Sequence, residues 1–387
     1  MVNYATEIVP VAFDVFSIVG MVLQIPVILT YLCGPHPNIP VSAIAGWFFY
    51  FNLRNVIAMI AWSGSNYEEW WQGKVWCDFD VRMNAGSQLG IFSALILSLT
   101  HLIRIFSLKT QVISNRITWQ RIVLEVAVCY SGPLILFAIY TPISTSRYLV
   151  NQYIGCSAAT DSSVLNVIFF VLWPALFGTI VPIMLGYLLW KVCRRGRSGT
   201  CEAISFVPTM SATQFVRLTV MTSIICFVLT PLSWCVAGVN LNVIADVGVS
   251  AVAWAHGKPK DWDEPTLLPF ALSMTPRFSY LNSAASISWA VEVSQLVLSY
   301  FVFAFYGTGT VAQQFYCKVL EALHLTGFAI KIRLLPPPYE RKDDYAESDC
   351  WSSSSPSGST FAASMYDKDT KRPKGMYTRS KPLEYSP

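Results

Sequence analysis

Long apolar stretches alternate with short polar ones along most of this chain. Each stretch is at least as long as the roughly 20 residues that an α-helix needs to cross a bilayer. Each is also apolar around most of its circumference, as expected of a helix that faces lipid. The sequence therefore predicts an all-α membrane protein, a bundle of seven transmembrane helices. The seven segments lie at about 8–33, 39–62, 77–106, 121–142, 164–190, 215–239 and 283–306.

The pattern changes twice after the seventh segment. Residues 309–335 alternate apolar and basic positions, which is typical of an amphipathic helix on the inner membrane surface. Residues 336–387 are rich in serine, proline and charge, a composition that cannot bury enough apolar area to fold. We therefore expect a transmembrane domain at 1–308, a juxtamembrane helix and a disordered cytosolic tail.

The composition supports the membrane assignment. Charged residues make up 13% of the chain and the mean hydropathy is +0.46, whereas a soluble protein carries about 25% charged residues. The lipid bilayer is thus the first expected partner. The net charge of +4 is small and dispersed, so nucleic acid is not expected as another. No internal repeat is visible, which argues against a transporter built from inverted repeats.

The connecting loops differ in positive charge, and this predicts an orientation. Twelve lysines and arginines lie on the side where the third and fifth segments end, and six lie on the other side. Because cytosolic loops carry the excess of positive charge, the N-terminus is predicted to be outside and the C-terminus in the cytosol.

Ten cysteines are spread along the chain without the spacing of a zinc site, and nothing in the sequence indicates a metal or a cofactor. Only Cys77 and Cys156 fall at or beyond the outer surface, where disulfides persist. A bond between them would hold the loop NQYIGCSAATD over the mouth of the bundle. Two unpaired thiols are the alternative.

The outer segment EEWWQGKVWCD, residues 68–78, concentrates tryptophan between two apolar stretches. Tryptophan at this depth commonly anchors a helix at the membrane–water interface. Trp70, Trp71 and Trp76 could serve only as anchors, or their apolar faces could also line the entrance for an apolar ligand. The sequence leaves both interpretations open.

Several classes of seven-helix protein can be excluded. Segment 283–306 contains no lysine, so it cannot form the Schiff base of a retinal protein. The third segment ends in THLIRIF and the seventh continues as SYFVFAFYGTG, without the motifs of rhodopsin-like receptors. No HExxH, GxSxG or intramembrane aspartate pair indicates an enzyme.

Six groups of residues between about positions 5 and 320 match a family pattern, and the tryptophan–cysteine–aspartate loop is the most specific of them. They are NIP at 38–40 with Trp47 and Asn52-Leu53; Trp71, Gly73 and Trp76-Cys77-Asp78 with Arg82 and Gly90-Ile91; SRY at 146–148 with GC at 155–156; WP at 173–174 with Gly178 and CRRGR; Arg217-Leu218 with Pro231-Leu232; and Glu292, Phe303 to Tyr306 and Gly307. The chain thereby resembles fungal mating-pheromone receptors of the a-factor type, a branch of the class D G-protein-coupled receptors, and its basidiomycete members most of all.

The chain departs from that family at two places. Many members end the third helix with an Arg-Arg-Leu-Tyr-like sequence, where this chain has Arg104 alone in HLIRIF. The third outer loop retains Trp254-Ala255-His256 and otherwise diverges.

The resemblance implies a plasma-membrane receptor without enzymatic activity. Its ligand would be a short secreted peptide with a farnesylated, methyl-esterified C-terminal cysteine, and its partner a heterotrimeric G protein that it contacts through Gα. Residues expected to meet the ligand are Trp62, Trp70, Trp71, Trp76, Arg82, Asp246, Trp254 and Glu292; Asp80 also lies on the outer side. For the charged positions, a solvated loop charge is the alternative.

Ionisable residues inside membrane helices are costly and commonly functional. Arg54, Asn55 and Glu292 are expected to form a polar network that changes on activation, or else a static interhelical contact. Pro231 should kink or break the sixth helix and so provide a pivot, or a static bend. A group of arginines on the inner side is expected to contact a G protein, and the alternative is that they only provide the positive charge usual on an inner surface. They are Arg104, Arg116, Arg194, Arg195, Arg197 and Arg217. An orphan receptor on the same scaffold, or a transporter or channel, remains an alternative function.

Overall fold

A computed structural model describes most of the chain. It covers residues 2–34, 37–64, 66, 69–107, 119–160, 163–205, 212–247, 266–268 and 279–309, with five further positions between 312 and 319. Met1–Ser348 forms one compact unit. The second unit, Asp349–Pro387, lies outside the described residues, as does the rest of the predicted disordered tail.

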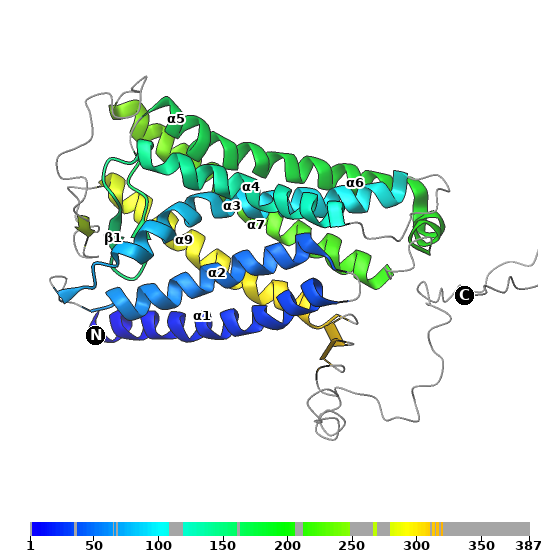
Figure 1. Cartoon of the computed structure of the whole chain (residues 1–387), viewed down its shortest axis with the longest axis horizontal. Coiled ribbons are helices and arrows are strands. Elements are labelled where there is room, and N and C mark those ends of the chain that lie inside the picture. The colour runs from blue at the N-terminus through cyan, green and yellow to red at the C-terminus, as the bar shows by residue number, and fades with distance from the viewer. Residues whose placement is uncertain are drawn as a thin grey trace, which may run out of the picture. The chain divides into compact units, whose positions relative to one another are not determined.

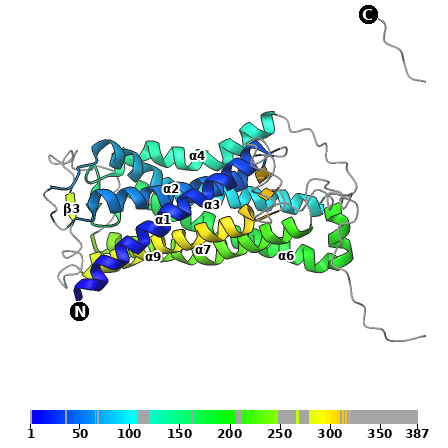
Figure 2. The same cartoon turned by 90° about the horizontal axis from the view of Figure 1, so that it is seen from below.

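Long helices that run back and forth make up the bundle (Figures 1 and 2). Seven of the described helices are long and apolar enough to cross a membrane, which confirms the predicted seven-helix architecture. They are α1 (Val2–Cys33), α2 (Ile39–Trp62), α3 (Lys74–Ser107), α4 (Trp119–Ile143), α6 (Trp173–Ser205), α7 (Ala212–Val247) and α9 (Ser279–Val302). The short helix α5 (Val164–Asn166) and the π-helical turn η2 (Val167–Leu172) lead into α6, and the π-helical turn η4 (Phe303–Gly307) follows α9.

Local sequence explains the start of α2 and a change of direction within α6. The Asn38 side chain accepts a hydrogen bond from the Val41 backbone N–H at 3.3 Å and so caps α2. Gly196 has φ 68° and ψ −177°, and the chain changes direction there before the last turns of α6. In contrast, α7 continues past Pro231 to Val247, so the predicted break at this proline does not occur. A neighbouring helix can compensate for the backbone hydrogen bond that proline removes.

The second and third spans form the centre of the bundle. Within their most apolar stretches 72% of α2 and 67% of α3 is buried, against 28% for α1 and α4. Small residues allow close contact at this centre: a Cβ atom on Gly90 of α3 would lie 2.5 Å from the Trp47 ring of α2. The helices at the periphery of the bundle, such as α1 and α4, therefore present most of their apolar surface to lipid.

A small sheet interrupts the expected all-α structure. β1 (Leu149–Asn151) pairs antiparallel with β2 (Gly155–Ser157) and parallel with β3 (Thr266–Leu268). It lies at the end of the bundle where α1 begins (Figure 1). Tyr153 and Gly155 have positive φ angles of 66° and 83°, which form the tight turn between β1 and β2. We call β1, its turn and β2 the hairpin.

The predicted amphipathic helix at 309–335 lies mostly outside the described residues. Its five described positions between 312 and 319 are helical: Ala312, Gln313, Phe315, Tyr316 and Val319. The helix beyond them stays a prediction.

Candidate functional site

A disulfide ties the hairpin to the bundle. Cys77, in the first turn of α3, is bonded to Cys156 of β2, with their Cα atoms 5.3 Å apart. The two residues are 79 positions apart in sequence. The bond therefore holds the loop between α4 and α5 against the starting end of α3, which is one of the two arrangements that the sequence left open.

The tryptophan-rich segment folds around Trp62, the last residue of α2. The buried Trp62 indole donates a hydrogen bond to the Trp71 carbonyl oxygen at 2.7 Å and stacks on the Trp71 ring. Gly73 has φ 59°, and a Cβ atom there would lie 2.9 Å from the Trp62 ring. Trp62 thus holds the tryptophan-rich segment against the end of α2 through this hydrogen bond and the stacked rings.

The other tryptophans of this segment differ in exposure. Trp70 is buried and donates a hydrogen bond to the Gly64 carbonyl oxygen at 2.9 Å. Trp71 is 53% exposed. Trp76 is half-buried and lies beside the Phe79 ring. Ligand contact by any of these rings stays a prediction, and Trp71 is the one most open to a partner.

A second contact holds the loop before the hairpin. Arg147 forms a two-pronged salt bridge with Asp78, and the Tyr148 hydroxyl donates a hydrogen bond to the Gln72 carbonyl oxygen at 2.9 Å. Burial raises the pKa of Tyr148, which keeps its phenol protonated as a donor. These residues of the SRY motif therefore connect α3, the tryptophan segment and the hairpin, a role that the sequence did not indicate.

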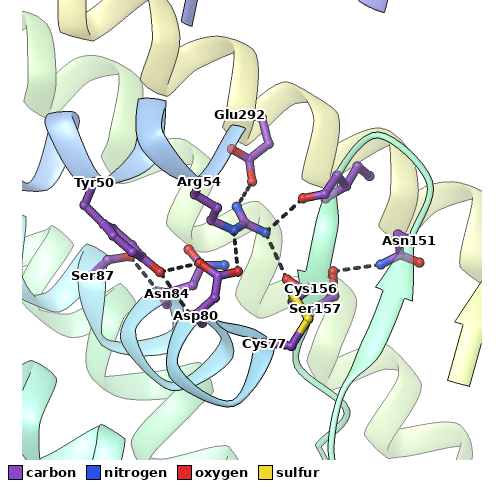
Figure 3. Close-up of polar contacts among 11 residues, drawn as sticks. Tyr50, Arg54, Cys77, Asp80, Asn84, Ser87, Asn151, Cys156, Ser157 and Glu292 are labelled. Atoms are coloured by element: carbon purple, nitrogen blue, oxygen red, sulfur yellow. Dashed lines mark hydrogen bonds and ion pairs between the residues drawn. A yellow bond between two sulfur atoms is a disulfide. The ribbon is translucent and has the colours of Figure 1, made fainter. Parts of the chain in front are cut away.

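Arg54 of α2 is the centre of a buried polar network (Figure 3). Only 2% of this residue is exposed. Its Nε donates to Asp80 Oδ2 at 3.0 Å and its Nη1 to Glu292 Oε1. Its Nη2 donates to the backbone oxygens of Cys156 at 3.1 Å and Ile154 at 3.4 Å. One guanidinium thus joins α2 to α3, to α9 and to the hairpin.

The sequence analysis assigned one member of this network, Asp80, to a different role and did not indicate another, Tyr50. Asp80 was grouped with outer charges that could meet ligand or solvent, yet it is fully buried. The Tyr50 hydroxyl, which no motif indicated, donates to Asp80 Oδ1 at 2.6 Å. Sequence spacing offers one signal in retrospect, because Asp80 lies one helical turn after Cys77 and so on the same side of α3.

The predicted trio of Arg54, Asn55 and Glu292 is brought together. Asn55 lies close enough to interact with the Glu292 carboxylate. Neither Asn55 Nδ2 nor Glu292 Oε2 has a hydrogen-bond partner among the described residues. A switching role for the trio stays a prediction.

The remaining ligand candidates lie apart from this network. Arg82 is half-buried over the Phe137 ring of α4, 5.3 Å from its centroid. Asp246 falls in the last turn of α7, where the structure does not describe its side chain. Trp254 lies outside the described residues.

Comparison with known proteins assigns the chain to a family. The family model described as Pheromone A receptor, STE3, matches residues 12–326. The chain belongs to the pheromone A receptor family. This family consists of receptors and not of enzymes, and its match extends over all seven apolar helices, as expected of a multi-pass membrane protein.

Curated relatives carry related names. The chain is 21% identical to the "Pheromone a factor receptor" of Saccharomyces cerevisiae over 81% of its own length and 63% of that receptor's length. It is 25% identical to the "Pheromone B beta 1 receptor" of Schizophyllum commune over 43% of its own length and 29% of the relative's length. The matched part is thus less than two thirds of these relatives. No solved structure matches the chain significantly.

Several arginines of this pheromone A receptor family member lie at the end of the bundle opposite the sheet. There α3 and α6 end and α7 begins, with Arg104, Arg194 and Arg195 exposed. Arg217 is half-buried beside Gly309, where a Cβ atom would lie 3.4 Å from Arg217 Nη1. The structure does not describe the side chain of Arg197, and Arg116 lies outside the described residues. Among the described residues, no cluster of His, Cys, Asp and Glu could hold a metal ion.

Proposed function

We propose that this protein is a G-protein-coupled receptor of the plasma membrane that responds to a secreted peptide mating pheromone. The observation that carries the proposal is the family match over residues 12–326, which includes all seven spans. The names of the fungal relatives support it, since each is described as a pheromone receptor. We place the sheet end of the bundle outside the cell and the arginine-bearing end in the cytosol.

The proposed ligand is a farnesylated peptide. The resemblance to a-factor receptors supports this choice, as does the relative named "Pheromone a factor receptor". An isoprenoid needs an apolar surface, and each buried methylene contributes about 0.8 kcal/mol. At the sheet end, Trp71 is 53% exposed and Phe79 is 43% exposed, so their rings offer apolar surface that a farnesyl chain could cover.

The Arg54 network supplies a route from this outer surface to the helices. Arg54 binds two hairpin carbonyl oxygens and, through the same guanidinium, Asp80 of α3 and Glu292 of α9. A ligand that moves the hairpin would therefore alter the ion pairs between three helices. The movement would reach the inner end, where Arg217 of α7 and the arginines of α6 would meet Gα.

The experiment uses yeast cells that lack their own a-factor receptor and carry a reporter driven by the pheromone-response G protein. Cells that express this chain are challenged with synthetic peptides in farnesylated and unfarnesylated forms. We expect reporter activity only with a farnesylated peptide and only when Gα is present.

Two results would contradict the proposed function. A protein that reaches the cell surface yet answers none of a broad panel of farnesylated peptides would be an orphan receptor. Solute uptake or ionic current that persists without the G protein would indicate a transporter or channel.

A further inference from the structure

The face of α6 that points away from the bundle carries an ordered row of side chains. The helix packs against α3 and α7, and Val181, Leu185 and Leu188 are buried on that side. The opposite face meets lipid, since only 28% of the most apolar stretch of this span is buried. Residues on that face recur at spacings of three and four and so share one side of the helix. We call them the α6 stripe: Ile183, Gly186, Tyr187, Trp190, Lys191 and Arg194.

Two aromatic rings of the α6 stripe stack on each other. The centroids of the Tyr187 and Trp190 rings are 5.8 Å apart and their planes differ by 25°. The two residues are 46% and 52% exposed. Among the described residues, the Tyr187 hydroxyl and the Trp190 indole N–H have no hydrogen-bond acceptor. Rings of this kind settle at the membrane–water interface, where lipid ester groups can accept their hydrogen bonds.

Each ring carries a cation from the next turn of the helix. Lys191 Nζ lies 4.8 Å from the centroid of the Tyr187 ring, and Arg194 Cζ lies 5.4 Å from the centroid of the Trp190 ring. Both distances are within the range of cation–π attraction. Long basic side chains otherwise adopt many rotamers, so the stacked rings hold two positive charges next to each other on the lipid-facing side of α6.

The helix itself does not neutralise this positive charge. Residues 173–201 include no aspartate or glutamate, and the first acidic residue of α6, Glu202, follows the change of direction at Gly196. Within the part of the chain that the structure describes, Arg194 forms no ion pair. An anion from outside the chain would therefore complement the cationic end of the α6 stripe.

Gly186 leaves open space beside the rings. A Cβ atom at this position would meet nothing within 4 Å. The glycine lies one turn before Trp190 and one turn after Ile183, which is 66% exposed. Glycine is less favourable than alanine inside a helix, and no side chain of this protein fills the space. A lipid chain can therefore approach the backbone closely here.

The order of the groups along the helix selects the occupant. Towards the inner end, the α6 stripe changes from apolar to aromatic to cationic, which is the order of chains, ester groups and phosphate in a phospholipid. A sterol would fit the apolar part but brings no charge. A second copy of this chain would place identical cations opposite each other in a symmetric contact, and these would repel.

We propose that the α6 stripe binds an anionic phospholipid of the cytoplasmic leaflet. Lys191 and Arg194 would contact its headgroup, and one acyl chain would lie along Gly186 and Ile183. Anionic lipids such as phosphatidylserine are concentrated in that leaflet. Arg195 follows Arg194 by about 100° around the helix and remains for contact with Gα. The choice of leaflet follows the proposed orientation, whereas binding itself requires neither that orientation nor a pheromone.

The test is native mass spectrometry of the full-length protein released from detergent micelles. The protein is first mixed with equal amounts of phosphatidylserine and phosphatidylcholine that have the same acyl chains, so that the two lipids differ only in their headgroups. Each cation near the membrane surface favours an anionic lipid by about a factor of five. With two cations, the first retained lipid should be phosphatidylserine in a ratio of about 25 to 1.

Four variants at exposed positions locate the site. Arg194→Gln should lower the preference for phosphatidylserine about fivefold, and Trp190→Leu should lower it about two- to fivefold because Arg194 loses its ring. Gly186→Leu fills the open space and should reduce retention of both lipids. The matched control is Arg104→Gln, which removes an exposed arginine of α3 at the same end of the bundle and should leave the preference unchanged.

A further sample contains excess glycerophosphoserine, the headgroup without acyl chains. We expect it not to displace the lipid, because the apolar part of the α6 stripe would then be left uncovered. Displacement would mean that the stripe takes a free phosphate group, which would overturn the proposal.

Three other results would also overturn it. One is equal retention of the two lipids. Another is a preference that Arg194→Gln and Arg104→Gln lower alike, which would reflect only the general positive charge of the inner end. The third is a lipid-free dimer, which would show that a second copy covers this face. None of these results bears on pheromone signalling, so failure of this site is distinguishable from failure of the proposed function.

Discussion

Arg54 shows how much one residue can determine inside a membrane bundle. Its guanidinium has five N–H donors in a fixed planar arrangement, and here they meet two carboxylates and two backbone oxygens from three separate elements. Lysine would present a single point charge and could not span these acceptors. The side chain is therefore both the counter-ion of the network and the attachment of the hairpin.

Replacing Arg54 with alanine is expected to destabilise the protein strongly. The change leaves Asp80 and Glu292 buried without their cation, and removal of one partner from a buried ion pair costs about 3–5 kcal/mol. We expect low surface expression and a lower melting temperature in detergent. The triple variant Arg54→Ala/Asp80→Asn/Glu292→Gln should recover much of the loss, because no charge is then left unpaired. A single variant as stable as the unaltered chain would contradict this account.

Glycine at position 73 is required by both backbone and space. Its φ of 59° lies in the left-handed region, and a Cβ atom would lie 2.9 Å from the Trp62 ring and 3.1 Å from the Cys77 sulfur. Gly73→Ala should lose about 1–2 kcal/mol from the backbone and about 1–3 kcal/mol from overpacking.

The matched control for this change is Gly238→Ala in α7, where nothing lies within 4 Å of the added methyl group. That variant should be neutral or gain about 0.5–1 kcal/mol, since alanine is the better helix former. The melting temperatures of the two variants, measured side by side, test the argument. Equal values would show that the tryptophan segment does not depend on Gly73.

At the scale of elements, the hairpin is held by a covalent bond and by hydrogen bonds to Arg54. Its strands have three residues each, too few for a stable ribbon in isolation. The disulfide to α3 and the bonds from α2 give the hairpin its position. Anything that changes the hairpin is therefore transmitted to the two central helices of the bundle.

Breaking the disulfide should loosen this element. Cys77→Ser, Cys156→Ser and the double variant are expected to lose the same amount of stability, about 2–4 kcal/mol, since each removes the same bond. Thermal melting without reductant is the measurement. Cys193→Ser is the control, because Cys193 is an exposed free thiol on α6. A double variant markedly worse than either single variant would mean that the two cysteines act separately.

Helix α7 contains Pro231 without losing its helical backbone. The neighbouring Thr230 hydroxyl donates to the Gly178 carbonyl oxygen of α6 at 2.9 Å, which fastens α7 to α6 beside the proline. The missing backbone N–H at 231 leaves the Phe227 carbonyl oxygen without its usual helical partner. This combination marks a point where α7 could bend while it remains attached to α6.

Pro231→Leu is accordingly expected to reduce signalling more than expression. Leucine restores the backbone hydrogen bond and stiffens α7, so the melting temperature should stay the same or rise while the reporter response falls. Surface staining and reporter activity are measured in the same cells. Pro182→Leu in α6 provides a comparison, since Pro182 is also internal to a helix. Equal losses of expression and signalling would mean that Pro231 serves folding alone.

At the scale of the whole molecule, the two ends of the bundle differ in chemistry. The sheet end carries the disulfide, the tryptophan segment and the Asp78–Arg147 pair. The opposite end carries exposed arginines on α3 and α6. This division matches the asymmetry of positive charge between the loops, which is the basis for the proposed orientation.

An epitope tag placed before Met1 should be accessible on intact cells, and a tag placed after Pro387 should be accessible only after permeabilisation. Positive charge near the membrane is retained in the cytosol, which predicts this arrangement. Antibody staining of both tagged proteins, with and without detergent, is the measurement. The reverse staining pattern, or both tags on one side, would rule out the orientation.

Much of the architecture was predictable because membrane insertion depends on local composition. Length and apolarity placed the seven helices close to their observed positions. A Cys77–Cys156 bond could be anticipated, with two free thiols as the alternative, because only these two of the ten cysteines were expected at the outer surface. Asp80 was misassigned because its position near the start of α3 says nothing about which neighbours cover it. The sheet was missed because strands of three residues carry too little periodicity to detect.

The sequence by itself determined that the chain crosses a membrane seven times, which loops are positively charged, and to which family its motifs belong. These are properties of composition and spacing along a line. Only the tertiary structure decided that Arg54 meets Glu292, 238 positions away, and that Asp80, Tyr50 and two hairpin carbonyl oxygens share the same network. The physical reason is that a buried charge must be satisfied by whatever groups packing brings beside it, and packing between distant helices has no local signature.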